Sequence, residues 1–178
     1  MTIDTPRKLI LMAGYPRCGK STVSTYLSNH LGFSRIGADD IRDEYGIKWG
    51  TDDQREDHLF YVAKHRLMEQ LHMGKNAVFD STAMYADIRR LMFDTNIYFD
   101  SHIAGTIPTS KYIVQLDTDW NVLLARQVAS GRKAEDLERY RREFQPIAPM
   151  PSVTILRYTS NTKDDLDAIC SDLCRKLS

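Results

Sequence analysis

The sequence has little cysteine and no long apolar run. Three cysteines, Cys18, Cys170 and Cys174, are spread over 178 residues. So sparse and odd a set argues against a disulfide framework and is typical of a reducing compartment. The first apolar run, Leu9–Ala13, is too short for a signal-peptide core or a membrane-spanning helix. We therefore expect a cytoplasmic protein without a membrane partner.

The chain also lacks a surplus of charge of either sign. It carries 24 basic and 24 acidic side chains, so the formal net charge is zero. This balance gives no electrostatic reason to wrap long nucleic acid, and it favours a small molecule or a short nucleic-acid end as partner. A chain of this length suffices for one domain with a sizeable core and is short for two. We expect a single domain over residues 1–178 and leave the oligomeric state open.

Short apolar runs alternate with helical patterns along the chain. The runs typical of buried strands are Lys8–Met12, Phe33–Ile36, Ala77–Phe79, Tyr112–Leu116 and Val153–Tyr158. Helical patterns cover Lys20–Asn29, Asp53–Met73, Ala86–Phe93, Asp119–Ala129 and Asp164–Lys176. Because parallel strands need long crossovers, which helices supply, the alternation predicts a three-layer α/β domain with a five-stranded parallel sheet. The stretch Asn96–Lys111 is expected to be an irregular connection.

A glycine-rich motif separates the first predicted strand from the first predicted helix. Residues 14–21 read Gly-Tyr-Pro-Arg-Cys-Gly-Lys-Ser and match G-x-x-x-x-G-K-[ST], a phosphate-binding loop (P-loop). Its glycines let successive N–H groups point at a phosphate, and the helix N-terminus adds its dipole. The predicted nucleotide-binding residues are Gly14, Tyr15, Pro16, Arg17, Cys18, Gly19, Lys20, Ser21 and Thr22. The motif predicts a nucleoside triphosphate, with the Lys20 ammonium on the β- and γ-phosphates and the Ser21 hydroxyl on Mg²⁺.

Acidic residues follow the second and third predicted strands. Asp39 and Asp40 come at the end of the second strand, with Arg42 one helical turn beyond Asp39. In open α/β sheets ligands bind at this edge, where a carboxylate can accept the proton of an attacking hydroxyl. We assign that role to Asp39, whereas Asp40 is expected to cap the next helix. Asp80 ends the third predicted strand, as a Mg²⁺-binding Walker B carboxylate does.

Taken together, these segments resemble a family of ATP-binding small kinases. The P-loop, "DDIR" at 39–42, "VFDST" at 78–82 and "LARQVASGRKAED" at 124–136 are similar to the polynucleotide 5′-kinase domain and the zeta-toxin-like kinases. The resemblance implies a sheet of order 2-3-1-4-5, an acceptor pocket over the strand ends and a mobile lid at about residues 126–145. It implies ATP as phosphoryl donor.

The resemblance also assigns roles to individual residues. It makes Asp39 the general base, Arg42 an acceptor-side ligand and Arg126 a lid arginine that reaches the phosphates. A second lid arginine of the polynucleotide-kinase pattern would fall on Ser130, and the nearest candidate is Arg132. In the family the segment around Asp80 borders the acceptor pocket, so Asp80 remains a metal ligand or an acceptor ligand. Lys20, Asp39 and Arg126 are thus the predicted catalytic residues.

The acceptor and one rival function stay open. The acceptor hydroxyl belongs to a nucleic-acid 5′ end or to a small metabolite. Four aromatic residues after "DDIR" could stack on a base, or could belong to the core or a pocket wall: Tyr45, Trp49, Phe60 and Tyr61. The rival is a GTPase-like switch without an acceptor substrate. Its formal support is D-x-x-G at Asp43–Gly46 and [NT]-K-x-D at Thr162–Asp165.

Overall fold

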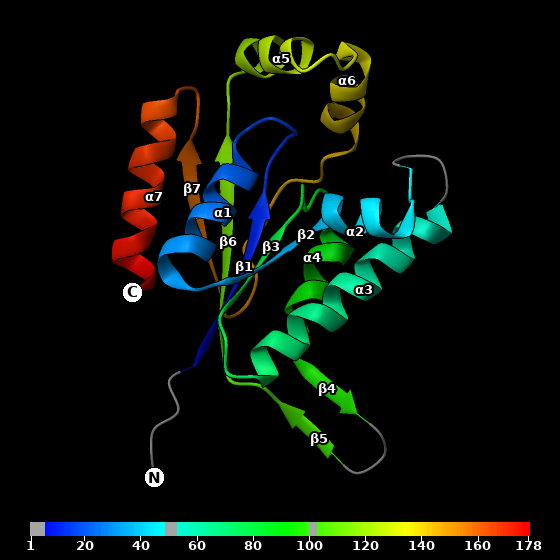
Figure 1. Ribbon diagram of the computed structural model, residues 1–178, viewed down its shortest axis with the longest axis vertical. Helices are drawn as coiled ribbons and strands as arrows, with labels where there is room; N and C mark the ends of the chain where they lie inside the picture. Colours follow the sequence, from blue (N-terminus) through cyan, green and yellow to red (C-terminus); the bar gives the residue numbers. More distant parts are fainter. Residues whose placement is uncertain (1–5, 49–52, 100–102) are drawn as a thin grey trace.

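A parallel sheet with helices on both faces forms the centre of the molecule (Figure 1). The computed structural model describes residues 6–48, 53–99 and 103–178. The strands of the central sheet are β1 (Arg7–Ala13), β2 (Ser34–Gly37), β3 (Ala77–Asp80), β6 (Thr109–Asp117) and β7 (Val153–Thr159). They run in the order β2-β3-β1-β6-β7, and every neighbouring pair is parallel. The predicted five-stranded parallel sheet and its order 2-3-1-4-5 are confirmed.

The described residues also form seven helices. They are α1 (Lys20–Leu31), α2 (Ala38–Tyr45), α3 (Asp53–His72), α4 (Ala86–Phe93), α5 (Trp120–Ala129), α6 (Ala134–Glu143) and α7 (Lys163–Leu177). α1 and α7 lie on one face, and α3 and α4 lie on the other (Figure 1). No helix in the described ranges is long and apolar enough to cross a bilayer.

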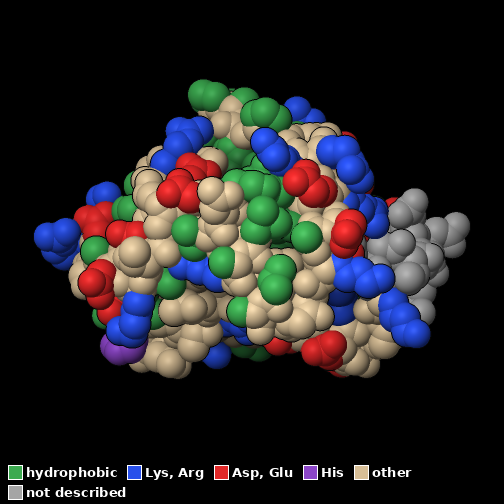
Figure 2. All heavy atoms as spheres, turned by 90° about the horizontal axis from the view of Figure 1, so that it is seen from above, with side chains coloured by type: hydrophobic (Ala, Val, Ile, Leu, Met, Phe, Trp, Pro, Cys, Tyr) green, Lys and Arg blue, Asp and Glu red, His purple; other side chains and the backbone are tan. Residues whose placement is uncertain are grey.

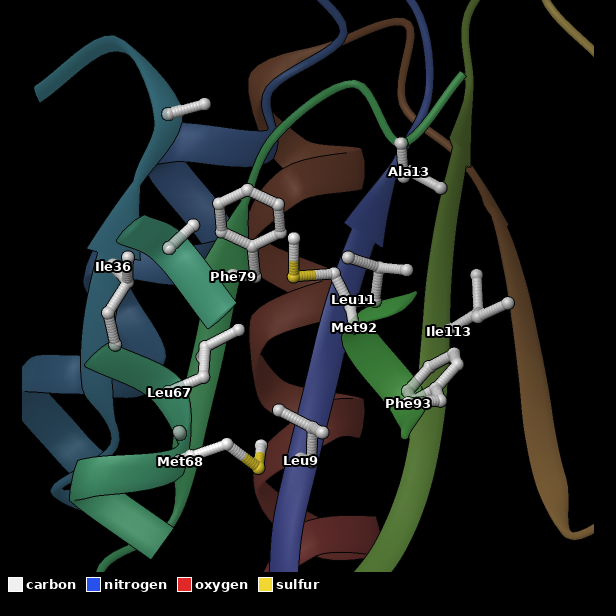
Figure 3. Close-up of a cluster of buried hydrophobic side chains, with 14 of the residues drawn as sticks. Leu9, Leu11, Ala13, Ile36, Leu67, Met68, Phe79, Met92, Phe93 and Ile113 are labelled. Carbon is white, nitrogen blue, oxygen red and sulfur yellow. The ribbon is translucent and has the colours of Figure 1, made fainter. Parts of the chain in front are cut away.

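Alternate side chains of β1 enter two separate cores. Leu9, Leu11 and Ala13 pack with α3 and α4, as Figure 3 shows for the cluster around Phe79. Ile10 and Met12 point to the α1 and α7 face. Because successive side chains of a strand point to opposite faces, a strand covered on both sides must be apolar throughout. This explains the continuous apolar run before the P-loop.

One prediction about the connections was wrong. The stretch expected to be irregular contains β4 (Asn96–Phe99) and β5 (Ile103–Thr106), which pair antiparallel as a hairpin. Two runs so close in the chain pair without a crossover, so a separate two-stranded sheet forms here. The hairpin lies at the end of the sheet where β1 begins (Figure 1). α5 and α6 lie above the opposite end, where the parallel strands finish.

Candidate functional site

The P-loop backbone is shaped by close approach to its neighbours. Gly14 has a φ of 138°, and a Cβ there would lie 2.5 Å from the carbonyl oxygen of Leu116. Gly19 has a φ of 100°, and a Cβ there would meet the Leu166 side chain at 2.5 Å. Only glycine tolerates both restrictions. Gly19 also precedes α1 without a side chain that could cap it, which leaves the first-turn N–H groups available to a phosphate.

The Lys20 side chain is folded back onto the loop. Its Nζ donates to the carbonyl oxygen of Tyr15 at 2.6 Å and lies 3.6 Å from the sulfur of Cys18. The residue is 8% exposed and Cys18 is fully buried. The ammonium is therefore satisfied by weak neutral acceptors that the oxygens of a triphosphate can replace. Ser21 and Thr22, which begin α1 next to Lys20, are exposed.

Asp39 and Arg42 belong to α2, which follows β2 directly: Asp39 lies in its first turn and Arg42 in its last. Nη1 of Arg42 donates to Oδ1 of Asp39 at 2.8 Å, and the Asp39 side chain is 88% exposed. On its other side Arg42 donates twice to Glu56 of α3, from Nε at 3.0 Å and from Nη2 at 2.8 Å. Burial lowers the pKa of Arg42, but the two carboxylates outweigh burial and raise it overall. The cluster holds one cation between two anions, and Asp39 is the member open to solvent.

Tyr140 brings α6 to the same cluster. Burial raises the pKa of its hydroxyl well above the usual value, and the groups that act on it electrostatically include Arg42, Asp39 and Glu56. The phenol is therefore neutral at physiological pH. Through Tyr140, α6, which belongs to the segment expected to form a lid, interacts with the residues expected to bind the acceptor.

Asp80 is held by a buried hydrogen-bond network at the end of β3. Its Oδ2 accepts from Nη2 of Arg35 at 2.6 Å, from Nε of Arg35 at 3.2 Å and from Oγ of Ser24 at 3.0 Å. Within the described residues its other oxygen, Oδ1, receives no hydrogen bond. Carboxylate and hydroxyl oxygens are the protein ligands that Mg²⁺ uses, together with water and phosphates. Asp80 and Ser21 therefore fit a magnesium ion by donor type.

Arg126 spans the P-loop and the turn after β7. Nη1 donates to the carbonyl oxygens of Arg17 at 3.0 Å and Ser160 at 3.2 Å, and Nη2 donates to that of Asn161 at 2.7 Å. The structure thus places Arg126 beside the nucleotide loop. Arg132 follows α5, is exposed and acts electrostatically on Tyr140.

An aromatic contact joins the P-loop to α5 and α6. The Tyr15 ring meets the edge of Trp120 with centroids 6.1 Å apart, and it lies 5.2 Å from Phe144. The Arg141 guanidinium lies over the Trp120 ring at 4.8 Å. Figure 2 looks down on this end of the molecule and shows hydrophobic side chains gathered at its centre among charged ones. The loop and the two helices above it therefore share one packed surface.

The two segments that support a GTPase have structural roles. Asp43–Gly46 is the end of α2, where Gly46 adopts the left-handed conformation of a helix C-cap. Thr162 and Asp165 form a capping box: Oγ1 of Thr162 accepts from the Asp165 N–H at 3.1 Å, and Asp165 accepts from the Thr162 N–H at 2.8 Å. The hydrogen bond from the Thr162 N–H lowers the pKa of the Asp165 carboxyl. Helix capping accounts for both patterns.

The aromatic residues after "DDIR" that the structure describes, Tyr45, Phe60 and Tyr61, do not gather into one wall. Phe60 packs edge-on against Phe79 in the core, whereas Tyr61 is exposed. Tyr45 is exposed and meets the ring of His58. Trp49 lies outside the described residues.

Sequence reasoning missed three residues that the structure brings to the site. Arg35, Glu56 and Tyr140 belong to no motif, and each reaches its partners only through packing between elements. The one available signal was Arg35 itself, because a charged residue within a short apolar strand pattern is typically paired when the strand is covered.

Comparisons with known proteins agree with this architecture. No curated protein matches the sequence. Among the solved structures that share the fold are three that are each 16% identical to this chain. Mycobacterium tuberculosis APS kinase, in complex with AMPPNP and APS, has a TM-score of 0.69, with 97% of this chain and 98% of that chain covered. A fungal RNA kinase has a TM-score of 0.66, with 96% and 86% covered. A gluconokinase from Sinorhizobium meliloti 1021 has a TM-score of 0.59, with 96% and 97% covered.

At such low identity these likenesses establish the fold alone. A model of the AAA domain family matches residues 9–147, which include the P-loop, Asp39, Asp80 and Arg126. The match spans most of the chain and agrees with the strand order and with the glycine-shaped loop at the end of β1. The chain belongs to the AAA domain family of P-loop proteins.

Proposed function

We propose that this protein is an ATP-dependent kinase that transfers the γ-phosphoryl group to an acceptor hydroxyl. The observation that carries the proposal is the position of Asp39. Its exposed carboxylate begins α2 at the end of the sheet where the P-loop follows β1. A P-loop alone would serve many functions, but a solvent-facing carboxylate at this edge can accept a hydroxyl proton.

The residues divide into a donor side and an acceptor side. On the donor side, Lys20 leaves Tyr15 and binds the β- and γ-phosphates, while the P-loop N–H groups hold the triphosphate. Mg²⁺ supplies charge neutralisation on the phosphates, and Ser21 and Asp80 are the residues that would hold it. We assign Arg126 and Arg132 to the nucleotide side as the two lid arginines. For Arg126, reaching a phosphate requires release of the carbonyl groups it now holds.

On the acceptor side, Asp39 orients the hydroxyl and accepts its proton. A new bond forms between the acceptor oxygen and the γ-phosphorus, and the bond from that phosphorus to the β–γ bridging oxygen breaks, so ADP leaves. Arg42 holds Asp39 in place and faces the acceptor. The expected gain comes from positioning and electrostatics, as in other phosphoryl transfers. Closure of residues 126–145 would exclude water, which competes with the acceptor.

The acceptor is a small molecule or a short nucleic-acid end. The structural neighbours are named for gluconate, APS and RNA, so the fold accommodates both classes. A regulatory GTP switch is the second candidate. The two segments on which it rests, Asp43–Gly46 and Thr162–Asp165, have helix-capping roles, which makes it the weaker candidate.

The test is transfer of label from γ-labelled ATP with Mg²⁺ to a panel of acceptors. The panel contains 5′-hydroxyl DNA and RNA oligonucleotides, sugars, sugar acids, nucleotide sugars and aminoglycosides. We expect Asp39→Asn to lower the rate about 10²- to 10⁴-fold without changing ATP affinity. Asp43→Asn, a matched change on α2, should keep the wild-type rate. Tighter binding of GTP than ATP, without transfer to any acceptor and with loss of GTP hydrolysis in Asp43→Asn, would favour the switch.

A further inference from the structure

Arg35 connects two carboxylates that come from different elements. From β2, its Nη2 donates to Oδ2 of Asp80 on β3 at 2.6 Å, and its Nη1 donates to Oδ2 of Asp40 on α2 at 2.6 Å. Asp80 is buried, whereas the Asp40 side chain is largely exposed. The pairing of Gly37 with Asp80 in the β2–β3 ladder places the two strand ends side by side. One guanidinium therefore ties the third strand to the helix that carries Asp39.

Ser24 extends this network to the P-loop helix. It is fully buried one turn after Ser21 on α1, and its Oγ lies 3.0 Å from Oδ2 of Asp80 and 3.2 Å from the carbonyl oxygen of Ser21. Nε of Arg35 also donates to this hydroxyl at 3.1 Å. The two residues expected to hold the metal, Ser21 and Asp80, are thus joined through one serine and one arginine.

The surroundings leave Arg35 little freedom to move. A Cβ on Gly37 would lie 2.2 Å from Oδ2 of Asp40 and 3.1 Å from Nη1 of Arg35, so the ion pair packs directly against this glycine. Burial lowers the pKa of Arg35, but Asp80 and Asp40 outweigh burial and raise it overall. A buried carboxylate without its cation would be costly, which gives Asp80 a reason to keep this partner.

We propose that Arg35 is a positioning residue that fixes the Asp80 carboxylate for the metal and, through Asp40, fixes the first turn of α2 that carries Asp39. Three donors occupy Oδ2 of Asp80 and leave Oδ1 without a partner among the described residues. A carboxylate locked through one oxygen presents the other in a fixed direction, as outer partners of metal ligands commonly do. This inference rests on the proposed function, because it assigns Asp80 to the metal.

Binding of Mn²⁺ tests the first half of the proposal without any acceptor. Electron paramagnetic resonance measures the Mn²⁺ affinity of the protein with ATP bound, and titration in EDTA measures ATP affinity without metal. We expect Arg35→Gln to weaken Mn²⁺ binding about 10- to 100-fold and to leave metal-free ATP binding within about twofold. Arg35→Lys should fall between Arg35→Gln and wild type. Arg66→Gln, which removes an exposed ion pair to Glu44, is the matched control and should match wild type.

Asp40→Asn tests the second half, because it releases α2 while Arg35 keeps Asp80. We expect the Mn²⁺ affinity of the wild type. We also expect a raised KM for the compound of the acceptor panel that the wild-type protein phosphorylates. If Arg35→Gln does not fold, judged by its thermal transition, the Arg35→Lys and Asp40→Asn results decide the question.

Two results would overturn the inference alone. One is wild-type Mn²⁺ affinity in a folded Arg35 variant, and the other is an equal loss of Mn²⁺ and metal-free ATP binding. Failure of the wild-type protein to bind ATP would instead remove the proposed function on which the inference rests.

Discussion

Arg42 and Glu56 form a two-contact ion pair that locks α2 against α3, with both carboxylate oxygens engaged at 3.0 and 2.8 Å. Both side chains are largely buried. Loss of one partner leaves the other side chain with a buried charge that is no longer compensated, which destabilises the fold. The same guanidinium also holds Asp39, so this pair fixes the position of the proposed base.

We expect Glu56→Gln to lower the free energy of unfolding by about 1–2 kcal/mol, because a neutral amide cannot replace the ion pair. Chemical denaturation measures this change. In a transfer assay the variant should raise the acceptor KM and leave the ATP KM unchanged. Glu44→Gln breaks an exposed pair with Arg66 between the same helices and should cost less than about 0.5 kcal/mol. Equal losses in the two variants would contradict the importance of the buried pair.

Arg89 is a buried cation whose guanidinium donates to backbone carbonyl groups rather than to carboxylates. It is 2% exposed and donates to the carbonyl oxygens of Ala83 at 2.7 Å, Met84 at 3.1 Å and Pro146 at 3.0 Å. Burial lowers its pKa. Its contacts fasten the segment after α6 to the loop after β3, where Ala83 has a positive φ of 47°.

We predict that Arg89→Met costs about 2–4 kcal/mol of unfolding free energy, since three buried carbonyl groups lose their donor. Denaturant unfolding is the measurement. The neighbouring Arg90→Met removes only an exposed pair with Asp87 and should change stability by less than about 0.5 kcal/mol. Stability of Arg89→Met within that same margin would show that the carbonyl groups find other donors.

The capping box of α7 gives a test of the [NT]-K-x-D motif at Thr162–Asp165. Thr162→Ala removes the hydroxyl that accepts from the Asp165 N–H, and we expect a loss of about 1 kcal/mol in unfolding free energy. Relative affinity for ATP and GTP, measured by titration calorimetry, should not change. A selective loss of GTP affinity would mean that this segment reads a guanine base after all.

The burial of Lys64 predicts that the stability of the protein depends on pH. Its Nζ is buried without a hydrogen-bond partner in the part of the chain that the structure describes, and burial lowers its pKa from 10.5 to about 8. Between pH 8 and pH 10.5 the lysine is largely protonated in the unfolded chain and largely neutral in the folded one, so the unfolded chain binds more protons. Stability attributable to this residue should therefore rise as pH increases from about 8 to about 10.5.

Below pH 8 the charged form is present in both states and destabilises the fold by about 1–2 kcal/mol, allowing for partial exposure. Lys64→Met should remove this cost, so the variant is more stable than wild type at pH 7 and loses the rise above pH 8. Thermal or urea unfolding across this range is the measurement. Parallel pH profiles for the two proteins would disprove the assignment.

The central sheet was predictable from sequence because its information is local. Each parallel strand is a short apolar run between helices, and β1 is apolar on both faces because both faces are covered. The P-loop was found for the same reason, since its glycines, Lys20 and Ser21 are consecutive in the chain. The sheet order came from the resemblance to small kinases.

The remaining features depend on contacts distant in sequence. Asp80 meets Arg35 because β2 pairs with β3 in a register that places Gly37 opposite Asp80. Glu56 meets Arg42 only because α3 packs on α2. The β4–β5 hairpin was missed because the pattern of four-residue strands is too short to distinguish them from a loop. The roles of the site residues stay predictions until transfer is measured.

The contact between Tyr15 and Trp120 also makes the nucleotide loop visible to spectroscopy. Indole emission changes when an aromatic neighbour or a nearby cation moves, and Trp120 has both in Tyr15 and Arg141. The chain has one other tryptophan, Trp49, so Trp49→Phe leaves a single emitter at the P-loop. Rearrangement of the loop around a triphosphate would then be recorded as a change in fluorescence, in real time and without a label.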